Sequence, residues 1–247
     1  MSVLTLQLAG PLQAWGSSAR FARRTTDSAP TKSAVVGLLA GALGRPRDAD
    51  LSDLASLRFG VRIDQPGTRL RDFQTAHKGD GGGPMPVSER FYLADAVFVA
   101  ALEGDRELLD NLRTALRTPH FMPFLGRRSC VPSRRIDLGL HEGATLIEAL
   151  RAEKWRASDW YQKRRRQDEA VELTALLESA PDNDLADAIR DQPISFSPRH
   201  RRYGLRGVVA QPVIVANPHA RPGGRRRAPV PPHDATSHLT PLNKDGD

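Results

Sequence analysis

The sequence contains a single cysteine, Cys130, and this scarcity excludes an internal disulfide and any zinc site built from several cysteines. It contains no run of about 18 apolar residues, so we expect no transmembrane helix and no membrane partner. Residues 1–8 lack the basic segment and the long apolar core of a signal peptide, so no secretion signal is expected. These absences favour a reducing, cytoplasmic location.

Sequence motifs of several enzyme classes are also missing. The histidines and acidic residues show neither HExxH nor HxE…CxxC spacing, so no metal site is expected. No G-x-S-x-G motif occurs, which disfavours a serine hydrolase of that type. The segment Thr31-Lys32-Ser33 lacks the preceding glycine of a phosphate-binding loop, so nucleotide hydrolysis is not expected. We therefore predict no cofactor.

Lysine is scarce in a chain that is nevertheless strongly basic. Lys and Arg total 36 against 29 Asp and Glu among 247 residues, which gives a net charge of +7. The only lysines are Lys32, Lys78, Lys154, Lys163 and Lys244. A basic excess favours a polyanionic partner, nucleic acid first, because guanidinium groups bind phosphate and stack on bases. A GC-rich genome would also replace lysine by arginine, so the positions of the arginines must decide between the two explanations.

Hydrophobic patterns divide residues 1–143 into alternating strands and helices. Val3–Leu8 alternates apolar and polar residues, which predicts a half-buried strand. The expected strands are residues 3–8, 57–64, 91–102 and 135–140, and the expected helices are residues 30–43 and 105–117. This order fits an α+β, ferredoxin-like βαββαβ domain, the fold also used by RNA-recognition modules. Residues 65–90 form too long a connection to be compact, and loops of this length are usually functional or mobile.

The signals change after about residue 145, which predicts a smaller C-terminal, β-containing region over residues 144–220. Residues 145–187 look mostly helical and polar. Strand character returns over residues 194–215, interrupted by Arg199-His200-Arg201-Arg202. Residues 221–247 are rich in Pro, Gly and Arg without periodicity, so we expect a disordered basic tail.

Two stretches near the N-terminus are candidates for binding RNA. Gln13 and Trp15 follow the first strand and could hydrogen-bond to and stack on a nucleotide, although a tryptophan that closes the edge of the core is an equally physical interpretation. Arg24 precedes Thr31-Lys32-Ser33, and these three residues lie at a predicted helix start, where free N–H groups favour an anion.

Two later loops are further candidates. Residues 71–78 combine basic, aromatic and flexible residues, which suits single-stranded RNA, and His77 with Lys78 could also serve acid–base cleavage of RNA. In residues 123–130, Gly126 allows a backbone conformation that exposes N–H groups, and Arg127, Arg128 and Ser129 can hold phosphates. An exposed basic loop without a ligand is the alternative. Cys130 is expected to be a small buried residue.

The run Lys163–Arg166 lies close to Trp155, Trp160 and Tyr161. It is either a solvated helix face or a patch that contacts a duplex or another protein. A DNA-binding regulator that uses the helical residues 145–187 is a further alternative for the whole chain.

Several motifs in order resemble one known family. They are Leu-Ala-Gly-Pro-Leu-Gln-Ala-Trp-Gly at 8–16, Pro-Thr-Lys-Ser followed by Gly-Leu-Leu-Ala within 30–40, Arg-Asp-Phe-Gln-Thr at 71–75, Arg-Phe-Tyr-Leu-Ala-Asp-Ala at 90–96, and Pro-Phe-Leu-Gly-Arg-Arg-Ser-Cys at 123–130. Together they resemble the Cas-five family, a branch of the RAMP superfamily whose members are subunits of the type I-E CRISPR surveillance complex, Cascade. The likeness is strong over residues 1–140 and weaker beyond.

The resemblance implies a ferredoxin-like domain with a long β-hairpin thumb, here about residues 67–90. It implies a non-catalytic subunit that binds the 5′ handle of the CRISPR RNA in antiviral defence. Its partners would be the Cascade backbone subunits, the large subunit that reads the protospacer-adjacent motif (PAM), and target DNA through the complex. A related branch cleaves precursor CRISPR RNA without metal, and this activity is the alternative. The implied RNA-binding residues are Gln13, Trp15, Arg24, Thr31, Lys32, Ser33, Arg71, His77, Arg90, Gly126, Arg127, Arg128, Ser129 and Cys130.

Overall fold

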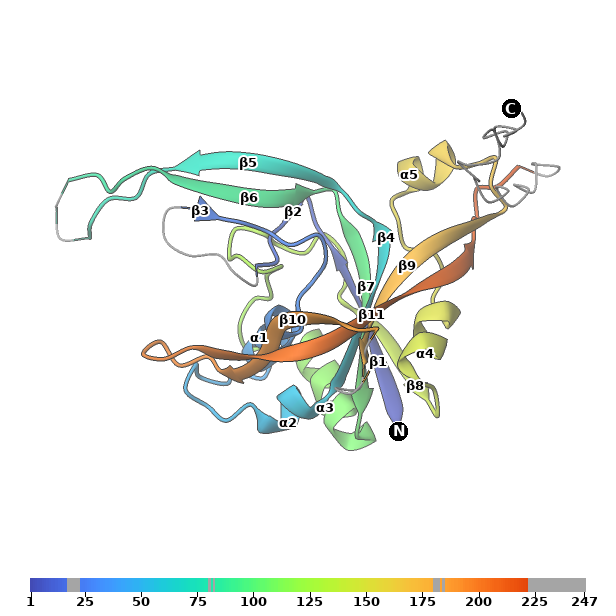
Figure 1. The fold of residues 1–247 in the computed structure, drawn as a ribbon, viewed down its shortest axis with the longest axis horizontal. Coiled ribbons are helices and arrows are strands. Elements are labelled where there is room, and N and C mark those ends of the chain that lie inside the picture. Colours follow the sequence, from blue (N-terminus) through green and yellow to red (C-terminus); the bar gives the residue numbers. More distant parts are fainter. Residues whose placement is uncertain (17–22, 80, 82, 180–182, 184, 222–247) are drawn as a thin grey trace, which may run out of the picture.

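A computed structural model describes residues 1–247 except 17–22, 80, 82, 180–182, 184 and 222–247. The fold is a mixed α+β structure dominated by antiparallel sheet (Figure 1). In the described part of the chain, the main sheet has the strand order β10-β11-β9-β4-β7-β1-β8. These strands are β1 (Ser2–Ala9), β4 (Arg58–Gln65), β7 (Val97–Gly104), β8 (Asp137–Glu142), β9 (Ala170–Ser179), β10 (Asp187–Ser195) and β11 (Arg202–Ala216).

Helices cover both faces of the central strands. The helices are α1 (Lys32–Ala42), α2 (Ser52–Ser56), α3 (Arg106–Arg117), α4 (Leu146–Ala152) and α5 (Asp159–Arg164). Both longer helices begin at a capping side chain, because Thr31 accepts a hydrogen bond from the Ala34 N–H and Asp105 accepts one from the Leu108 N–H. The expected positions of α1 and α3 are therefore confirmed.

The prediction that the first strand is half-buried is wrong. Every residue of β1 is buried, because α1 and α3 pack on one face and α4 packs on the other. Leu4, Leu6 and Leu8 belong to the first core cluster. On the opposite face, the Thr5 hydroxyl donates a hydrogen bond to Glu153 Oε1 at 2.9 Å, so this polar side chain is satisfied inside the protein.

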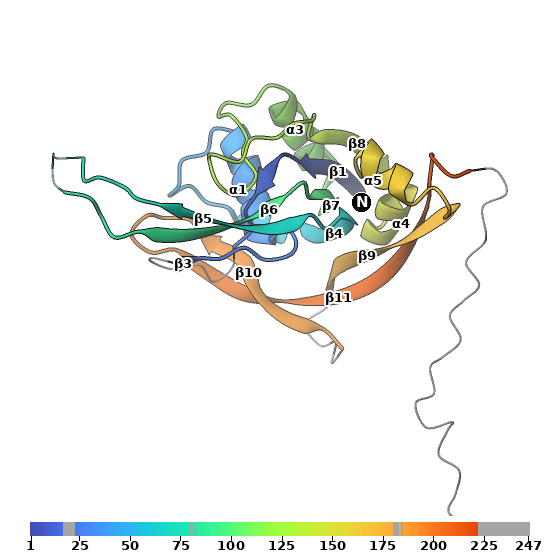
Figure 2. The same ribbon diagram turned by 90° about the horizontal axis from the view of Figure 1, so that it is seen from above.

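A smaller sheet forms a projecting hairpin that spans the segment expected to be the thumb. Its long strands are β5 (Thr68–Gln74) and β6 (Ser88–Ala94), which pair from Thr68↔Ala94 to Gln74↔Ser88. Two short strands also pair with β6. Strand β2 (Leu12–Gln13) pairs antiparallel at its base, and β3 (Arg23–Arg24) pairs parallel farther along the thumb, at Glu89 and Arg90. Figure 2 shows the hairpin extending well beyond the main sheet.

Residues 91–102, expected as one strand, belong to two. Strand β6 ends at Ala94 and β7 begins at Val97. Asp95 between them has a φ of 55°, so the chain turns there from the smaller sheet into the main sheet.

The prediction that residues 145–187 are mostly helical is wrong. The two short helices α4 and α5 are followed by the ten-residue strand β9. Val171, Leu173, Ala175 and Leu177 alternate with more exposed residues along β9, and Leu177 pairs with Gly60 of β4. The strand character expected over residues 194–215 is confirmed as parts of the β10–β11 hairpin. Of the expected tail, residues 222–247 lie outside the described residues.

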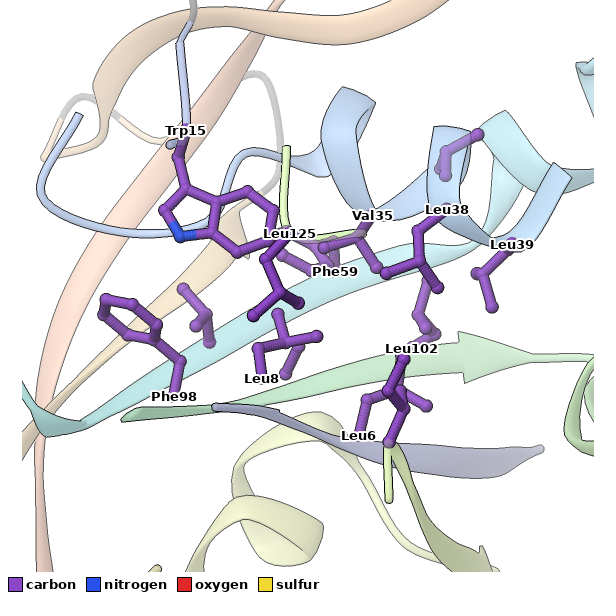
Figure 3. Close-up of a cluster of buried hydrophobic side chains, with 14 of the residues drawn as sticks. Leu6, Leu8, Trp15, Val35, Leu38, Leu39, Phe59, Phe98, Leu102 and Leu125 are labelled. Atoms are coloured by element: carbon purple, nitrogen blue, oxygen red, sulfur yellow. The ribbon is translucent and has the colours of Figure 1, made fainter. Parts of the chain in front are cut away.

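One hydrophobic core cluster lies between the main sheet and α1, and a second lies on the opposite face of the sheet, under α4. Figure 3 shows Leu6, Leu8, Phe98 and Leu102 from the sheet facing Val35, Leu38 and Leu39 of the helix, with Trp15 and Leu125 at one side of the cluster. In the part of the chain that the structure describes, no helix is long and apolar enough to cross a membrane.

Candidate nucleic-acid interface

Three loops that are distant in sequence meet at the base of the thumb. The loop after β1 contacts residues 123–131, where the Ala14 N–H donates a hydrogen bond to the Leu125 carbonyl at 3.1 Å. The same loop contacts the segment before α1, because the Trp15 N–H donates to Thr26 Oγ1 at 2.9 Å. These hydrogen bonds therefore bring together the first motif, the last motif and the segment that leads into the second motif.

Gly126 is required where two of these loops touch. Its φ is +84°, and a Cβ at this position would lie 1.7 Å from the Ala14 carbonyl oxygen. Any side chain would therefore overlap the neighbouring backbone. The turn that follows is closed by hydrogen bonds from the Cys130 N–H to the Arg127 carbonyl at 2.8 Å and from the Leu125 N–H to the Cys130 carbonyl at 2.7 Å.

Arg127 is held in place by the loops around it. Its Nη2 donates a hydrogen bond to the Arg24 carbonyl at 2.9 Å, and its guanidinium lies 4.6 Å from the centre of the Tyr92 ring. Its Nη1 is buried and has no hydrogen-bond partner among the described residues. The neighbouring residues Arg128 and Ser129 are exposed. The loop therefore combines a half-buried guanidinium that is held in place with an exposed arginine beside it.

The paired strands of the thumb add further arginines to this surface. The parallel pairing of β3 with β6 sets Arg24 opposite Arg90 and Arg23 opposite Glu89. Glu89 forms ion pairs with Arg23, at 3.8 Å, and with Arg71. For Arg24, Arg90 and Arg128, no ion pair is found within the described residues. The predicted site residues Arg24, Arg71, Arg90, Gly126, Arg127, Arg128 and Ser129 thus lie in these converging segments.

Gln13 and Trp15 are placed inside the protein instead. Both side chains are completely buried, and the Trp15 indole N–H donates to Gln13 Oε1 at 3.0 Å while Gln13 Nε2 donates to the Ala96 carbonyl at 2.7 Å. The expectation that Trp15 stacks on a nucleotide is thereby corrected. The indole closes the edge of the core, as the alternative interpretation held.

The start of α1 is occupied by groups of the chain itself. Lys32 is 1% exposed, and its Nζ lies 3.0 Å from Glu178 Oε2, while its backbone N–H donates to Asp191 Oδ2 at 2.8 Å. Burial lowers the pKa of Lys32, although Glu178 opposes this effect. Buried Thr31 caps the helix, and its hydroxyl lies 3.4 Å from that of half-buried Ser33. The anion expected at this helix start is therefore the Asp191 carboxylate of the chain itself. The prediction that Lys32 contacts RNA directly is wrong.

His77, a candidate for acid–base chemistry, lies apart from these loops, and Cys130 lies inside them. His77 is exposed beyond the end of β5, in the turn of the thumb, where its backbone bridges to Pro84. Cys130 is 1% exposed and burial raises the pKa of its thiol. The expectation of a small buried residue is therefore confirmed, and its prediction as an RNA-binding residue is corrected. The described residues contain no group of three or more His, Cys, Asp or Glu that could hold a metal ion.

Sequence reasoning missed the residues that orient the arginines. Tyr92 supports Arg127 and Glu89 pairs with two arginines, yet neither was predicted as part of the site. Their roles depend on the pairing of β6 with β3 and β5, and no local sequence pattern predicts this pairing.

Known proteins share this combination of fold and motifs. A family model described as CRISPR-associated protein (Cas_Cas5) matches residues 3–209. The chain is 35% identical over 170 residues to the CRISPR system Cascade subunit CasD of Escherichia coli (strain K12), and the alignment covers 60% of this chain and 75% of that protein.

Two solved structures resemble the whole fold. One is described as a crystal structure of a Cas protein, and it matches with a TM-score of 0.67 at 38% identity over 90% of this chain and 100% of that chain. The other, described as a CRISPR RNA-guided surveillance complex, matches with a TM-score of 0.72 at 30% identity over 90% of this chain and 95% of that chain. The family model spans most of the sequence, including all the converging loops, and the chain belongs to the Cas5 family of CRISPR-associated proteins.

Proposed function

We propose that this chain is a non-catalytic subunit of a Cascade-type CRISPR surveillance complex and that it binds the 5′ handle of the CRISPR RNA. The observation that carries this proposal is the oriented Arg127 beside exposed Arg128, on the loop that shares backbone contacts with the first motif of the family. A similar protein is a Cascade subunit, and a similar structure belongs to an RNA-guided complex. In this role the chain helps to assemble an antiviral, RNA-guided DNA surveillance complex.

We assign the RNA contacts to the exposed and half-buried arginines of the converging loops and the thumb strands, which we call the arginine surface. Its members are Arg23, Arg24, Arg71, Arg90, Arg127 and Arg128. Guanidinium groups bind phosphate through two parallel hydrogen bonds, and Arg128 is exposed with no ion pair among the described residues. Gln13, Trp15 and Cys130 are buried residues of the converging loops, and their hydrogen bonds hold these loops in place.

A ferredoxin-like unit is proposed for residues 1–143. Four antiparallel strands in the order β4-β7-β1-β8 support it, with α1 between β1 and β4 in sequence and α3 between β7 and β8. This is the strand and helix order of a βαββαβ domain. Residues 144–220 are proposed as a smaller region that extends the same sheet, since β9 pairs with β4.

We assign the thumb as the surface that contacts a neighbouring backbone subunit. Leu70, Phe73, Met85 and Val87 are exposed apolar side chains of this hairpin, and clustered exposed apolar groups mark protein contacts. The large PAM-reading subunit would dock near the handle, and target DNA would be reached through the complex. A cytoplasmic location follows from this assignment.

The purified chain is expected to leave precursor RNA intact. No hydrogen bond or ion pair orients the His77 or Lys78 side chain among the described residues, and acid–base catalysis needs positioned groups. The check is incubation with labelled repeat RNA in the absence of metal. A single cut just upstream of the handle, lost in His77→Ala with Lys78→Ala, would establish the endoribonuclease alternative instead.

Replacing Arg127 and Arg128 together by alanine is expected to weaken handle binding and to flatten its salt dependence. For a single strand, each lost phosphate contact lowers the slope of log affinity against log salt by about 0.7. The measurement is fluorescence anisotropy of labelled handle RNA over a series of salt concentrations.

A matched control removes the same charge elsewhere. Arg106 and Arg151 are exposed on α3 and α4, and their replacement by alanine should leave the slope unchanged. If the two double variants lose affinity equally, only the total charge matters and the assignment to the 123–130 loop is wrong.

A further inference from the structure

A second basic surface lies at the end of the molecule away from the thumb. We call Trp160, Lys163, Arg164, Arg166 and Arg221 the α5 patch, since all but Arg221 lie on or just after this helix. Both Figure 1 and Figure 2 place α5 and the thumb at opposite ends. The α5 patch is therefore separate from the arginine surface.

The indole of Trp160 is both accessible and held in place. Its side chain is 49% exposed, whereas Trp15 and Trp155 are buried. The Tyr161 ring packs edge-on against Trp160 at 5.6 Å and against Trp155 at 6.0 Å between ring centres. Trp155 in turn donates an indole hydrogen bond to the Asp64 carbonyl at 2.9 Å. An aromatic series thus connects the exposed indole to the core.

Several cations lie on or beside the same short helix as this indole. The Arg164 guanidinium lies 5.9 Å from the centre of the Trp160 ring, and Lys163, Arg166 and Arg221 are exposed. No ion pair is found for these four cations among the described residues. The Arg221 N–H donates to the Arg166 carbonyl at 3.0 Å, which brings the C-terminal segment against the helix end.

The favourable interaction of cations with a helix C-terminus explains part of this pattern. Lys163 and Arg164 lie in the last turn of α5, where a positive charge is stabilised by the helix dipole. It does not explain the exposed, fixed indole, nor the arrival of Arg221 from a distant part of the chain. Tryptophan and arginine together are typical of residues that dominate binding surfaces.

We propose that the α5 patch binds a single-stranded nucleic acid, with one base stacked on Trp160 and phosphates held by the surrounding cations. An exposed aromatic face next to positive charge is the arrangement by which proteins bind single strands without sequence preference. A duplex hides its base faces, and an acidic peptide would use the charges without the indole. This site acts beside the proposed handle site and does not depend on it.

The three tryptophans allow a direct test on the full chain. Because Trp15 and Trp155 are buried, acrylamide should quench mainly Trp160. An oligonucleotide of about 16 thymidines or uridines, long enough for a typical single-strand site, should protect this emission. An oligonucleotide bound only at the arginine surface would leave the quenching unchanged, so failure of the patch and failure of the handle site give different results.

Variants then measure the contribution of each group to affinity. Trp160→Ala is expected to weaken oligonucleotide binding about 5- to 150-fold, the range of base–aromatic stacking, while Trp160→Phe retains most of it. Lys163→Gln, Arg166→Gln and Arg221→Gln together should lower the salt slope by about 0.7 for each lost phosphate contact. The matched control is Arg47→Gln, Arg106→Gln and Arg151→Gln, three exposed arginines outside the patch.

The two oligonucleotides identify the strand that the patch uses. Protection by thymidines alone supports a DNA strand, protection by uridines alone supports an RNA strand, and protection by both supports recognition of the shared backbone. The proposal is overturned if neither oligonucleotide protects Trp160, if Trp160→Ala binds like the unchanged chain, or if the control loses as much affinity as the patch variant.

Discussion

Gly126→Ala is expected to lower the free energy of unfolding by about 2–6 kcal/mol. About 1–3 kcal/mol comes from forcing a residue with a Cβ into left-handed backbone, and about 1–3 kcal/mol comes from overpacking. The overlap is severe, since the Cβ would lie 1.7 Å from the Ala14 carbonyl oxygen, and a backbone atom cannot rotate away as a side chain can. Chemical denaturation followed by circular dichroism measures the change.

The same substitution is expected to abolish tight handle binding even where the chain still folds. The loop can relieve the overlap only by moving away from the Ala14 backbone, which breaks the hydrogen bond between Ala14 and Leu125. Arg127 would then lose its fixed position beside Tyr92 and Arg24. Handle affinity that stays unchanged in a folded Gly126→Ala protein would show that this loop does not bind the RNA.

Gly143→Ala is the matched control. Gly143 also has a left-handed backbone, with a φ of +67°, but a Cβ there meets no atom within 4 Å. Its replacement should therefore cost only the backbone term of about 1–3 kcal/mol. It should also leave handle binding intact. Equal effects of the two alanines would mean that the contact with Ala14 contributes nothing.

Arg62→Ala is expected to lower the free energy of unfolding by about 3–5 kcal/mol, the usual cost of breaking a buried ion pair. The Arg62 and Asp64 side chains are fully buried and pair at 2.7 Å. Arg62 also donates to the carbonyls of Leu150, Glu153 and Lys154, the last two at 2.7 and 2.9 Å. These carbonyls lie at and after the end of α4, so the guanidinium holds this segment against β4.

A double variant separates the contribution of the Arg62–Asp64 ion pair from that of the hydrogen bonds between Arg62 and the backbone carbonyls. The double change Arg62→Met with Asp64→Leu removes both charges, which is often neutral for a simple buried pair. Here we expect it to remain destabilised by about 2 kcal/mol or more, because carbonyls that accepted from Arg62 lose their donor. Full recovery in the double variant would show that the pair, and not the carbonyl contacts, is what Arg62 provides.

An exposed ion pair serves as the control. Arg106 and Glu142 pair at 2.9 Å with both side chains about 60% exposed. Arg106→Ala should change the free energy of unfolding by at most about 1 kcal/mol, because water screens this pair.

Local sequence patterns predicted the elements that carry a clear period. Helix α3 has an apolar stripe and a capping aspartate, and strand β4 alternates, so both were found where expected. Strand β9 was missed although its apolar residues alternate with Glu172 and Thr174, because its Ala, Leu and Glu residues favour a helix and it follows a polar helical stretch. Pairing with β4 and β11 fixes it as a strand, and that pairing comes from distant parts of the chain.

The candidate site, too, was predicted from sequence only in part. Motif order was enough to select the loop with Arg127 and Arg128 and the strand segment with Arg90. It could not show that Trp15 faces the core or that Lys32 pairs with Glu178, 146 residues away. A basic or aromatic residue in a promising motif is equally compatible with binding and with burial until its surroundings are known.

The sequence by itself determined the family, the α+β class and the positions of most of its arginine-rich loops, because these depend on local order and periodicity. The tertiary structure decided which of those residues can reach a ligand. Burial and ion pairing depend on contacts such as Ala14 with Leu125, β3 with β6, and Lys32 with Glu178, which close only when the chain is folded. The physical reason is that the neighbours of a side chain in space decide whether it is buried, paired with an opposite charge or available to bind a ligand.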